Sequence, residues 1–276
     1  MTSGREPAEN IATASTLIRQ ARTEGADLVM TPEITNMLEP TRAALMAKAV
    51  PETEDTALAA FQALAAELQI WLLVGSLVVR VADDRAANRS ILLDPAGRIV
   101  ARYDKIHMFD VEIPDGQSYR ESRSFQAGDQ AVLVDLPWGR LGLTVCYDLR
   151  FPYLYRALAQ AGAAFLSVPA AFTKFTGEAH WHVLLRARAI ETGCFVFAPA
   201  QCGTHAKGRQ TFGHSLIVAP WGEVLADGGE APGVTLAEID PARVEQARAM
   251  VPALRHDRPF DGPGGPEAAP VRAAGE

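Results

Sequence analysis

Apolar residues recur at helical spacing close to the start of the chain. The spacing begins after Pro7 and stops at Gly25. Its members are Ile11, Ala14, Leu17, Ile18 and Ala21. A mostly apolar run over residues 26–30 follows and is typical of a buried strand. The pattern therefore predicts a helix that leads directly into a strand.

Further helix and strand patterns alternate along the chain. The predicted helices cover residues 53–68, the segment after Pro152 and residues 180–192. The predicted strands cover residues 70–79, 141–145, 163–168, 194–198 and 233–239. Two hairpins are predicted around Asp94-Pro95-Ala96-Gly97 and Pro220-Trp221-Gly222, with arms 88–93 and 98–103, and 212–219 and 223–226. These elements predict an α/β fold in which a mixed sheet is layered with helices.

Length and composition set the number of domains. A chain of 276 residues, 48% of them hydrophobic, can bury one large core, so we expect one domain over residues 1–260. Residues 261–276 are rich in Gly, Pro and Ala and have too few large apolar side chains to pack, so we predict a disordered tail.

The first predicted helix has no strand before it. Such a strand would complete a β-α-β unit with the strand that contains Met30. We therefore expect that residues ahead of Met1, if they exist, would raise the stability of the fold. Equal melting temperatures for the given chain and an extended one would contradict this expectation.

Charge and cysteine content limit the class of partner. The net charge of −7, without any basic run, argues against nucleic acid or an anionic membrane as the main partner. No apolar stretch approaches the roughly 20 residues of a membrane span. Three cysteines, Cys146, Cys194 and Cys202, fit neither a zinc ribbon nor a disulfide framework, which favours a reducing cytoplasm. A small molecule or another subunit is the expected partner.

Cys146 lies between a predicted strand and a predicted helix. Unpaired N–H groups at the start of a helix, together with the nearby Arg150, would favour a thiolate. A nucleophile needs that form, but a buried cysteine that serves only in packing is the alternative. Glu33 and Lys105 also lie where predicted strands end, and each has an ordinary interpretation as a solvated charge.

The segments around these three residues resemble those of a known family. Pro32-Glu33, Tyr103-Asp104-Lys105-Ile106-His107 and Val145-Cys146-Tyr147-Asp148-Leu149-Arg150-Phe151-Pro152 occur in the order seen in the nitrilase superfamily of carbon–nitrogen hydrolases. The resemblance continues through residues 179–181, 185–191, 200–203, 213–215 and 220–222. It implies a four-layer α-β-β-α sandwich and a catalytic triad of Glu33, Lys105 and Cys146.

The resemblance also implies a mechanism. Cys146 would attack an amide carbonyl, expel ammonia and leave a thioester that water hydrolyses, with Glu33 as the general base. Lys105 would neutralise the oxyanion, and the backbone N–H of Tyr147 would be a second donor. Glu121 matches a second glutamate that family members place beside the lysine, although a surface carboxylate is its alternative interpretation.

Substrate and assembly follow from the same resemblance. The chain looks most like the branch that hydrolyses deaminated glutathione, a relative of the ω-amidases that act on α-ketoglutaramate. Arg150, Phe172 and Thr173 are candidate contacts for a keto-acid carboxylate, and a structural role for Arg150 stays open. No cofactor is implied. A homodimer or higher oligomer is expected, with residues 180–192 either at the interface or in the core.

Other functions compete with this interpretation. A Cys-His pair would need one of six histidines, none of which lies in a papain-like pattern. His180 and His182 are too close on a helix to share a metal easily, so no metal is expected. A nitrile hydrolase, an N-carbamoyl amino-acid hydrolase and a scaffold without turnover are the remaining alternatives.

Overall fold

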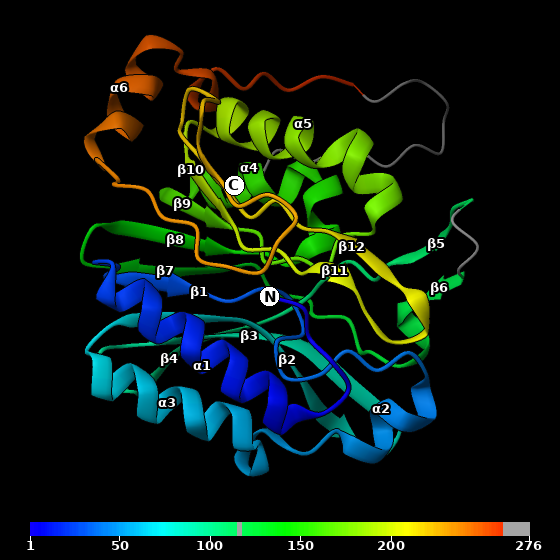
Figure 1. Ribbon diagram of the computed structural model, residues 1–276. Helices are drawn as coiled ribbons and strands as arrows, with labels where there is room; N and C mark the ends of the chain where they lie inside the picture. The colour runs from blue at the N-terminus through cyan, green and yellow to red at the C-terminus, as the bar shows by residue number, and fades with distance from the viewer. Residues whose placement is uncertain (115–117, 262–276) are drawn as a thin grey trace.

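Two β-sheets lie face to face between two layers of helices. The computed structural model describes residues 1–114 and 118–261, and Figure 1 shows this arrangement. Helices α1 (Pro7–Thr23) and α3 (Thr56–Leu68) cover one sheet, and α4 (Pro152–Gln160) and α5 (Lys174–Thr192) cover the other. The expected α-β-β-α sandwich is confirmed. The predicted tail, apart from Asp261, lies outside the described residues.

The first sheet is built from the first 104 residues. Its strands, in spatial order, are β1 (Leu28–Met30), β2 (Trp71–Ala82), β3 (Arg85–Leu93) and β4 (Ile99–Asp104). β1 runs parallel to β2, and the other pairs are antiparallel. The predicted turn joins β3 to β4, and the Asp94 carboxylate accepts the Ala96 and Arg98 N–H groups there. The strands predicted for this sheet and the first hairpin are therefore confirmed.

The second sheet follows in the chain and has six strands. In spatial order they are β14 (Val224–Asp227), β13 (Leu216–Val218), β10 (Phe195–Ala198), β9 (Ala163–Ser167), β8 (Gly139–Leu143) and β7 (Val132–Leu136). Two small ribbons pair β5 (Asp110–Glu112) with β6 (Ser118–Arg120) and β11 (Cys202–Thr204) with β12 (Gln210–Phe212).

Shorter helices complete the chain. The α-helices are α2 (Arg42–Lys48) and α6 (Ala242–Met250). The 3₁₀ turns are η1 (Glu52–Glu54), η2 (Glu121–Arg123), η3 (Cys146–Arg150), η4 (Ala206–Gly208) and η5 (Ala253–Arg255).

Side chains that alternate along β2 and β3 contribute to two core layers, one on each face of the first sheet. Leu73 and Leu92 pack with the second sheet, whereas their neighbours Leu72 and Leu93 pack with α1 and α3. Since successive side chains of a strand point to opposite faces, both faces of this sheet are covered. This explains why residues 70–79 form a nearly continuous apolar run rather than an alternating one.

Two strand predictions need correction. Residues 233–239 form no strand, because no other segment of the described chain offers them a ladder of backbone hydrogen bonds. The predicted arm 212–219 is divided between β12 and β13, because Gly213 and His214 adopt positive φ angles of 74° and 54°. Such angles interrupt the pleat of a strand.

An open cleft lies along the outer edge of β1. Its volume is about 640 Å³, and its walls include Met1, Ile18, Phe165, β1 and residues 233–239. The Trp71 N–H donates to the Asp27 carbonyl, and the Thr31 N–H donates to the Leu73 carbonyl. In a parallel ladder, alternate residues of a strand direct their backbone groups toward the neighbouring strand. Because Asp27 and Thr31 bond to β2, the backbone groups of Leu28 and Met30 face the cleft.

An added strand should stabilise the fold at this edge. Residues placed ahead of Met1 would find backbone partners on β1 and apolar walls on both sides, so an extension of five or six apolar residues should raise the melting temperature. The measurement compares the given chain with this extension by calorimetry. As a matched control, an extension of equal length made of Gly and Ser should leave the melting temperature unchanged.

Candidate active site

Three segments that are distant in the sequence bring Glu33, Lys105 and Cys146 together. Glu33 follows β1, Lys105 follows β4 directly, and Cys146 opens η3 after β8. All three side chains are buried, with exposed fractions of 4%, 2% and 7%. The Lys105 Nζ atom lies 2.9 Å from Glu33 Oε1, and the Cys146 thiol hydrogen-bonds to the same carboxylate. The three groups are therefore in direct contact.

Glu33 is held as an anion that can accept a proton. Its Oε1 atom accepts hydrogen bonds from Lys105 Nζ and Asn88 Nδ2, both at 2.9 Å, and its Oε2 accepts the Ala171 N–H at 2.7 Å. Burial by itself would raise the pKa of Glu33. The Lys105 ammonium and the hydrogen bonds outweigh burial and lower this pKa below its ordinary value.

Lys105 lies between two carboxylates. Its Nζ atom is 2.8 Å from Glu121 Oε2 as well as 2.9 Å from Glu33 Oε1. Glu121 Oε2 also accepts the Phe109 N–H at 2.6 Å, so the carboxylate is fixed in place. Burial would lower the pKa of Lys105, but Glu121 and Glu33 raise it well above its ordinary value. Lys105 therefore stays protonated. When the Cys146 thiol is neutral, Glu33, Glu121 and Lys105 together carry one net negative charge.

The Cys146 thiol is neutral in the resting site. Burial raises its pKa well above the ordinary value, and the Glu33 carboxylate raises it further, against the opposing effect of Lys105. Arg150 is not among the groups that affect this pKa most, and its guanidinium nitrogens lie 3.3 Å from His180 Nδ1. The expectation that Arg150 and the helix start favour a thiolate is therefore wrong. The Glu33 carboxylate, which is in contact with the thiol, is a group that can accept its proton.

A strained turn presents the Cys146 side chain. Cys146 has a φ angle of +49°, which is rare for a residue with a side chain, and its N–H donates to the Pro169 carbonyl. Within the described residues, the N–H of Tyr147 has no acceptor. This is the donor that an oxyanion formed at the Cys146 sulfur would meet.

The candidate substrate contacts lie at the edge of this group. The Arg150 guanidinium carbon lies 5.3 Å from the centre of the Phe172 ring. Phe172 directly follows Ala171, whose N–H binds Glu33, so this side chain is close to the site. The Thr173 hydroxyl is buried and lies 2.7 Å from the Thr176 hydroxyl. Thr173 therefore supports the start of α5, and its hydroxyl already has a partner.

Comparisons with known proteins agree with this geometry. The model of a family described as carbon-nitrogen hydrolase matches residues 2–249. The chain belongs to this family. It is 45% identical to the deaminated glutathione amidase of a Synechocystis strain, over 93% of this chain and 95% of that protein.

Two solved structures extend the comparison. The crystal structure of the Caenorhabditis elegans NitFhit protein matches with a TM-score of 0.87 and 38% identity, over 94% of this chain and 63% of that one. Saccharomyces cerevisiae Nit3, a member of branch 10 of the nitrilase superfamily, matches with a TM-score of 0.81 and 29% identity, over 91% of this chain and 92% of that one. The resemblance to the nitrilase superfamily is therefore confirmed.

Asn88 is a site residue of this carbon–nitrogen hydrolase that the sequence analysis missed. Its side-chain amide donates to Glu33 Oε1 at 2.9 Å and to Glu121 Oε1 at 3.1 Å, so it joins the two carboxylates. The sequence offered little signal, because Asn88 is one of four polar residues in β3 and its burial is visible only in the folded chain. A buried amide of this kind must find partners in the folded protein.

Asp148 is the second missed residue, and it ties the Cys146 turn to the Lys105 segment. It is fully buried, and its Oδ2 atom accepts the Val145 N–H at 2.8 Å and the Tyr103 hydroxyl at 2.7 Å. Its Oδ1 atom accepts the His107 N–H at 3.0 Å. Tyr103 and His107 stand on either side of Lys105. One carboxylate thus holds both the Cys146 turn and the segment that carries Lys105.

An Asp148→Asn variant should therefore lose both stability and turnover. The asparagine amide has the size of the carboxylate, but only its oxygen atom can accept a hydrogen bond. Hydrogen bonds to a charged group contribute about 1.5–3 kcal/mol each. We expect unfolding in urea to show a loss of roughly 2–4 kcal/mol and kcat to fall at least tenfold. Asp135→Asn removes an exposed carboxylate and should change neither quantity. Wild-type stability in Asp148→Asn would contradict this role.

Proposed function

We propose that this chain is an amidase that hydrolyses deaminated glutathione through a thioester on Cys146. The observation that supports it most is the contact of a neutral buried thiol with a carboxylate held as an anion by an adjacent ammonium. Such a group can transfer a proton within the site without any change in its net charge. Relatives named deaminated glutathione amidase support the choice of substrate.

Acylation follows from the contacts of Glu33. Its carboxylate takes the thiol proton as the sulfur bonds to the amide carbonyl carbon. The resulting oxyanion is stabilised by the Tyr147 N–H and by the positive charge of Lys105, whose ammonium also holds the Glu33 and Glu121 carboxylates. Glu33, now protonated, donates to the departing nitrogen as the carbon–nitrogen bond breaks, and a thioester remains.

Deacylation uses the same carboxylate in the opposite sense. Glu33, again an anion, takes a proton from water as the water oxygen attacks the thioester carbonyl, and the proton returns to the Cys146 sulfur. The leaving group depends on the substrate. A primary amide such as α-ketoglutaramate releases ammonia, as the sequence analysis expected. The amide nitrogen of deaminated glutathione belongs to cysteinylglycine, so this dipeptide leaves instead.

Arg150 is the proposed partner of the keto-acid carboxylate. No carboxylate among the described residues pairs with its guanidinium, which contacts only the rings of His180 and Phe172. Surface arginines of this chain, such as Arg140 with Asp135, mostly have an acidic partner. An arginine without one, beside the loop that contacts Glu33, is suited to bind an anionic substrate.

An Arg150→Met variant should bind keto-acid substrates more weakly. Loss of one charge-assisted contact of about 1.5–3 kcal/mol corresponds to a rise in KM of roughly 10- to 100-fold, with a smaller change in kcat. Steady-state kinetics on deaminated glutathione measure both constants. Arg140→Met, on the surface, is the matched control. A fall in kcat at constant KM would contradict a role in binding the carboxylate.

One experiment tests the proposed function. Deaminated glutathione and α-ketoglutaramate both yield 2-oxoglutarate, so its formation is followed by chromatography for the two substrates side by side. We expect faster turnover of deaminated glutathione by the wild type and none by Cys146→Ala. Faster turnover of α-ketoglutaramate would favour an ω-amidase. Turnover of neither would favour a nitrile or N-carbamoyl substrate, or a scaffold without activity.

Assembly and location complete the proposal. We expect a homodimer or higher oligomer through α5, where Val183 and Ile190 are exposed by 67% and 57%, and no nucleic-acid partner. Sedimentation measures the number of subunits.

Among the described residues, no helix has the length and apolar character to cross a membrane. We place the protein in the cytoplasm because its three cysteines are free.

A further inference from the structure

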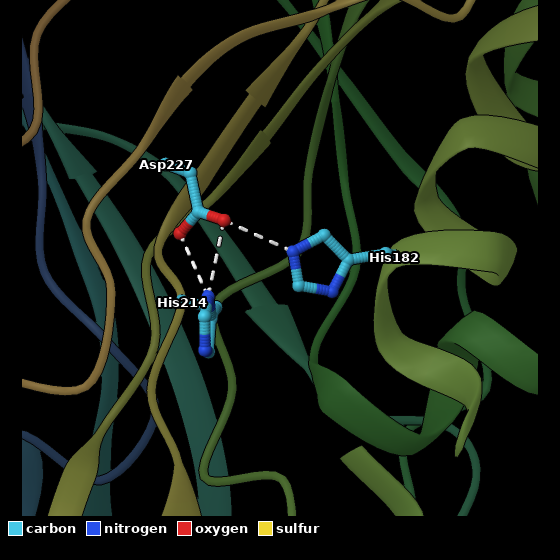
Figure 2. Close-up of side chains that lie close together, drawn as sticks. All are labelled: His182, His214 and Asp227. Carbon is cyan, nitrogen blue, oxygen red and sulfur yellow. Dashed lines mark hydrogen bonds and ion pairs between the residues drawn. The ribbon is translucent and has the colours of Figure 1, made fainter. Parts of the chain in front are cut away.

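A second cluster of ionisable side chains lies outside the group around Cys146. His182 comes from α5, His214 from the loop between β12 and β13, and Asp227 from the end of β14. Figure 2 shows the two imidazole rings directed at the two oxygens of the Asp227 carboxylate. One ligand atom of each residue lies within 4.8 Å of the others. Three separate elements thus place three metal-binding side chains at one point.

The contacts within the cluster are close and specific. His182 Nε2 lies 3.0 Å from Asp227 Oδ2, and His214 Nδ1 lies 2.9 Å from Asp227 Oδ1. No lysine or arginine in the described part of the chain pairs with Asp227. Within residues 1–114 and 118–261, the carboxylate has only the two imidazoles and the Gly229 N–H as partners. Its negative charge is available to a cation.

The surroundings hold the ligands in place. The His214 ring is stacked on Phe212 at a centroid distance of 4.4 Å, and the His182 ring meets the edge of the same phenyl ring at 5.9 Å. The His214 N–H donates to the Gly229 carbonyl at 2.6 Å, and the His214 carbonyl accepts the Trp181 indole N–H at 2.8 Å. Ligands whose backbone and rings are already oriented lose less freedom when they bind an ion.

We propose that His182, His214 and Asp227 bind a divalent transition-metal ion. Two imidazole nitrogens and one carboxylate oxygen are ligands of Zn²⁺ and related ions, whereas Mg²⁺ and Ca²⁺ prefer oxygen alone. Zinc bonds of about 2.0–2.1 Å require ligand atoms a little over 3 Å apart, so small rotations of the rings suffice. The side chains are partly exposed, which leaves room for water as a fourth ligand.

The ion would join parts of the fold that are now linked by hydrogen bonds. It would connect α5 with the β13–β14 hairpin, next to Trp181, whose ring lies 5.0 Å from Phe172. The earlier expectation of no metal concerned His180 with His182. The fold instead places His182 beside two residues that are far away in the sequence.

Calorimetric titration of the full chain, without an affinity tag, with Zn²⁺ tests this site. The titration uses a Cys146→Ala background, because the thiol is itself a zinc ligand. We expect one saturable site, a rise in melting temperature with Zn²⁺, and no binding of Mg²⁺. His182→Gln, His214→Gln and Asp227→Asn should each weaken binding more than tenfold, since even loss of a supporting partner costs about 10–100-fold. His180→Ala, on the same helix, should bind as the parent does.

A second measurement does not depend on the folding of the three ligand variants. Co²⁺ bound by this cluster in the Cys146→Ala protein should give visible absorption bands without a sulfur-to-metal charge-transfer band. The absence of saturable Zn²⁺ binding would overturn the proposal. So would binding that the three substitutions leave unchanged or that His180→Ala abolishes, because the ion would then lie elsewhere. These outcomes are independent of amidase activity.

Discussion

Replacement of Lys105 by methionine should destabilise the protein and stop turnover together. The ammonium is 2% exposed and lies between Glu33 and Glu121 at 2.9 and 2.8 Å, so its loss leaves the buried Glu33 carboxylate and the partly buried Glu121 carboxylate without compensation. Removing one partner of a buried ion pair costs about 3–5 kcal/mol. Loss of an oxyanion donor lowers kcat by roughly 100- to 1,000-fold. Urea unfolding and steady-state kinetics measure the two effects.

Two control variants separate charge from packing. Lys174→Met removes a lysine of an exposed pair with Glu230 and should cost at most about 1 kcal/mol. Lys105→Met combined with Glu121→Gln removes one of the uncompensated charges and should recover part of the stability but none of the turnover. Wild-type stability of Lys105→Met alone would show that the two carboxylates do not depend on this ammonium.

Replacement of Glu33 by glutamine should lower kcat by about 100- to 10,000-fold, the contribution of a general base. The thiol remains, but its proton has no acceptor. Because the wild-type pKa of Glu33 lies below 4.5, the base form persists at neutral pH and kcat/KM should fall only on the acid side of that value. The lowered pKa also means that Glu33 stabilises the fold above about pH 4.5, and this stability is lost as the pH falls through the native pKa.

The pH profile distinguishes a base from a structural residue. In Glu33→Gln the thiol must ionise by itself, so residual kcat/KM should rise with pH through the alkaline range, whereas the wild-type profile should be level there. Glu54→Gln, an exposed glutamate, should retain the wild-type profile. A Glu33→Gln profile parallel to that of the wild type would mean that Glu33 only positions its neighbours.

Local patterns predicted much of the fold, whereas the candidate site residues Glu33, Lys105 and Cys146 were chosen by the resemblance to a known family. Periodicity located α1, β2 and the β3–β4 hairpin because their apolar residues face a core on known sides. The prediction of a strand at 233–239 failed because a strand also needs a partner, and the partner edge is not visible in local composition. In the folded chain this segment forms part of the wall of the cleft beside β1.

Contacts between distant segments were beyond the reach of the sequence alone. Asn88 looked like one polar residue of a strand, and Asp148 looked like part of a turn, yet each joins two segments of the site. The ionisation of Cys146 was also misjudged. A helix start and an arginine nearby in sequence suggested a thiolate, whereas burial and the Glu33 carboxylate determine the pKa in the folded protein.

The most direct test of the proposed mechanism is the mass of the enzyme during turnover. Deaminated glutathione and α-ketoglutaramate would both leave the same 2-oxoglutaryl group on the Cys146 sulfur, because only the departing nitrogen differs. Rapid acid quenching followed by intact-mass and peptide mass spectrometry should find this one adduct, on the Cys146 peptide, with either substrate that turns over, and none in Cys146→Ala. Turnover without any adduct, or an adduct that persists in Cys146→Ala, would contradict a thioester at this residue.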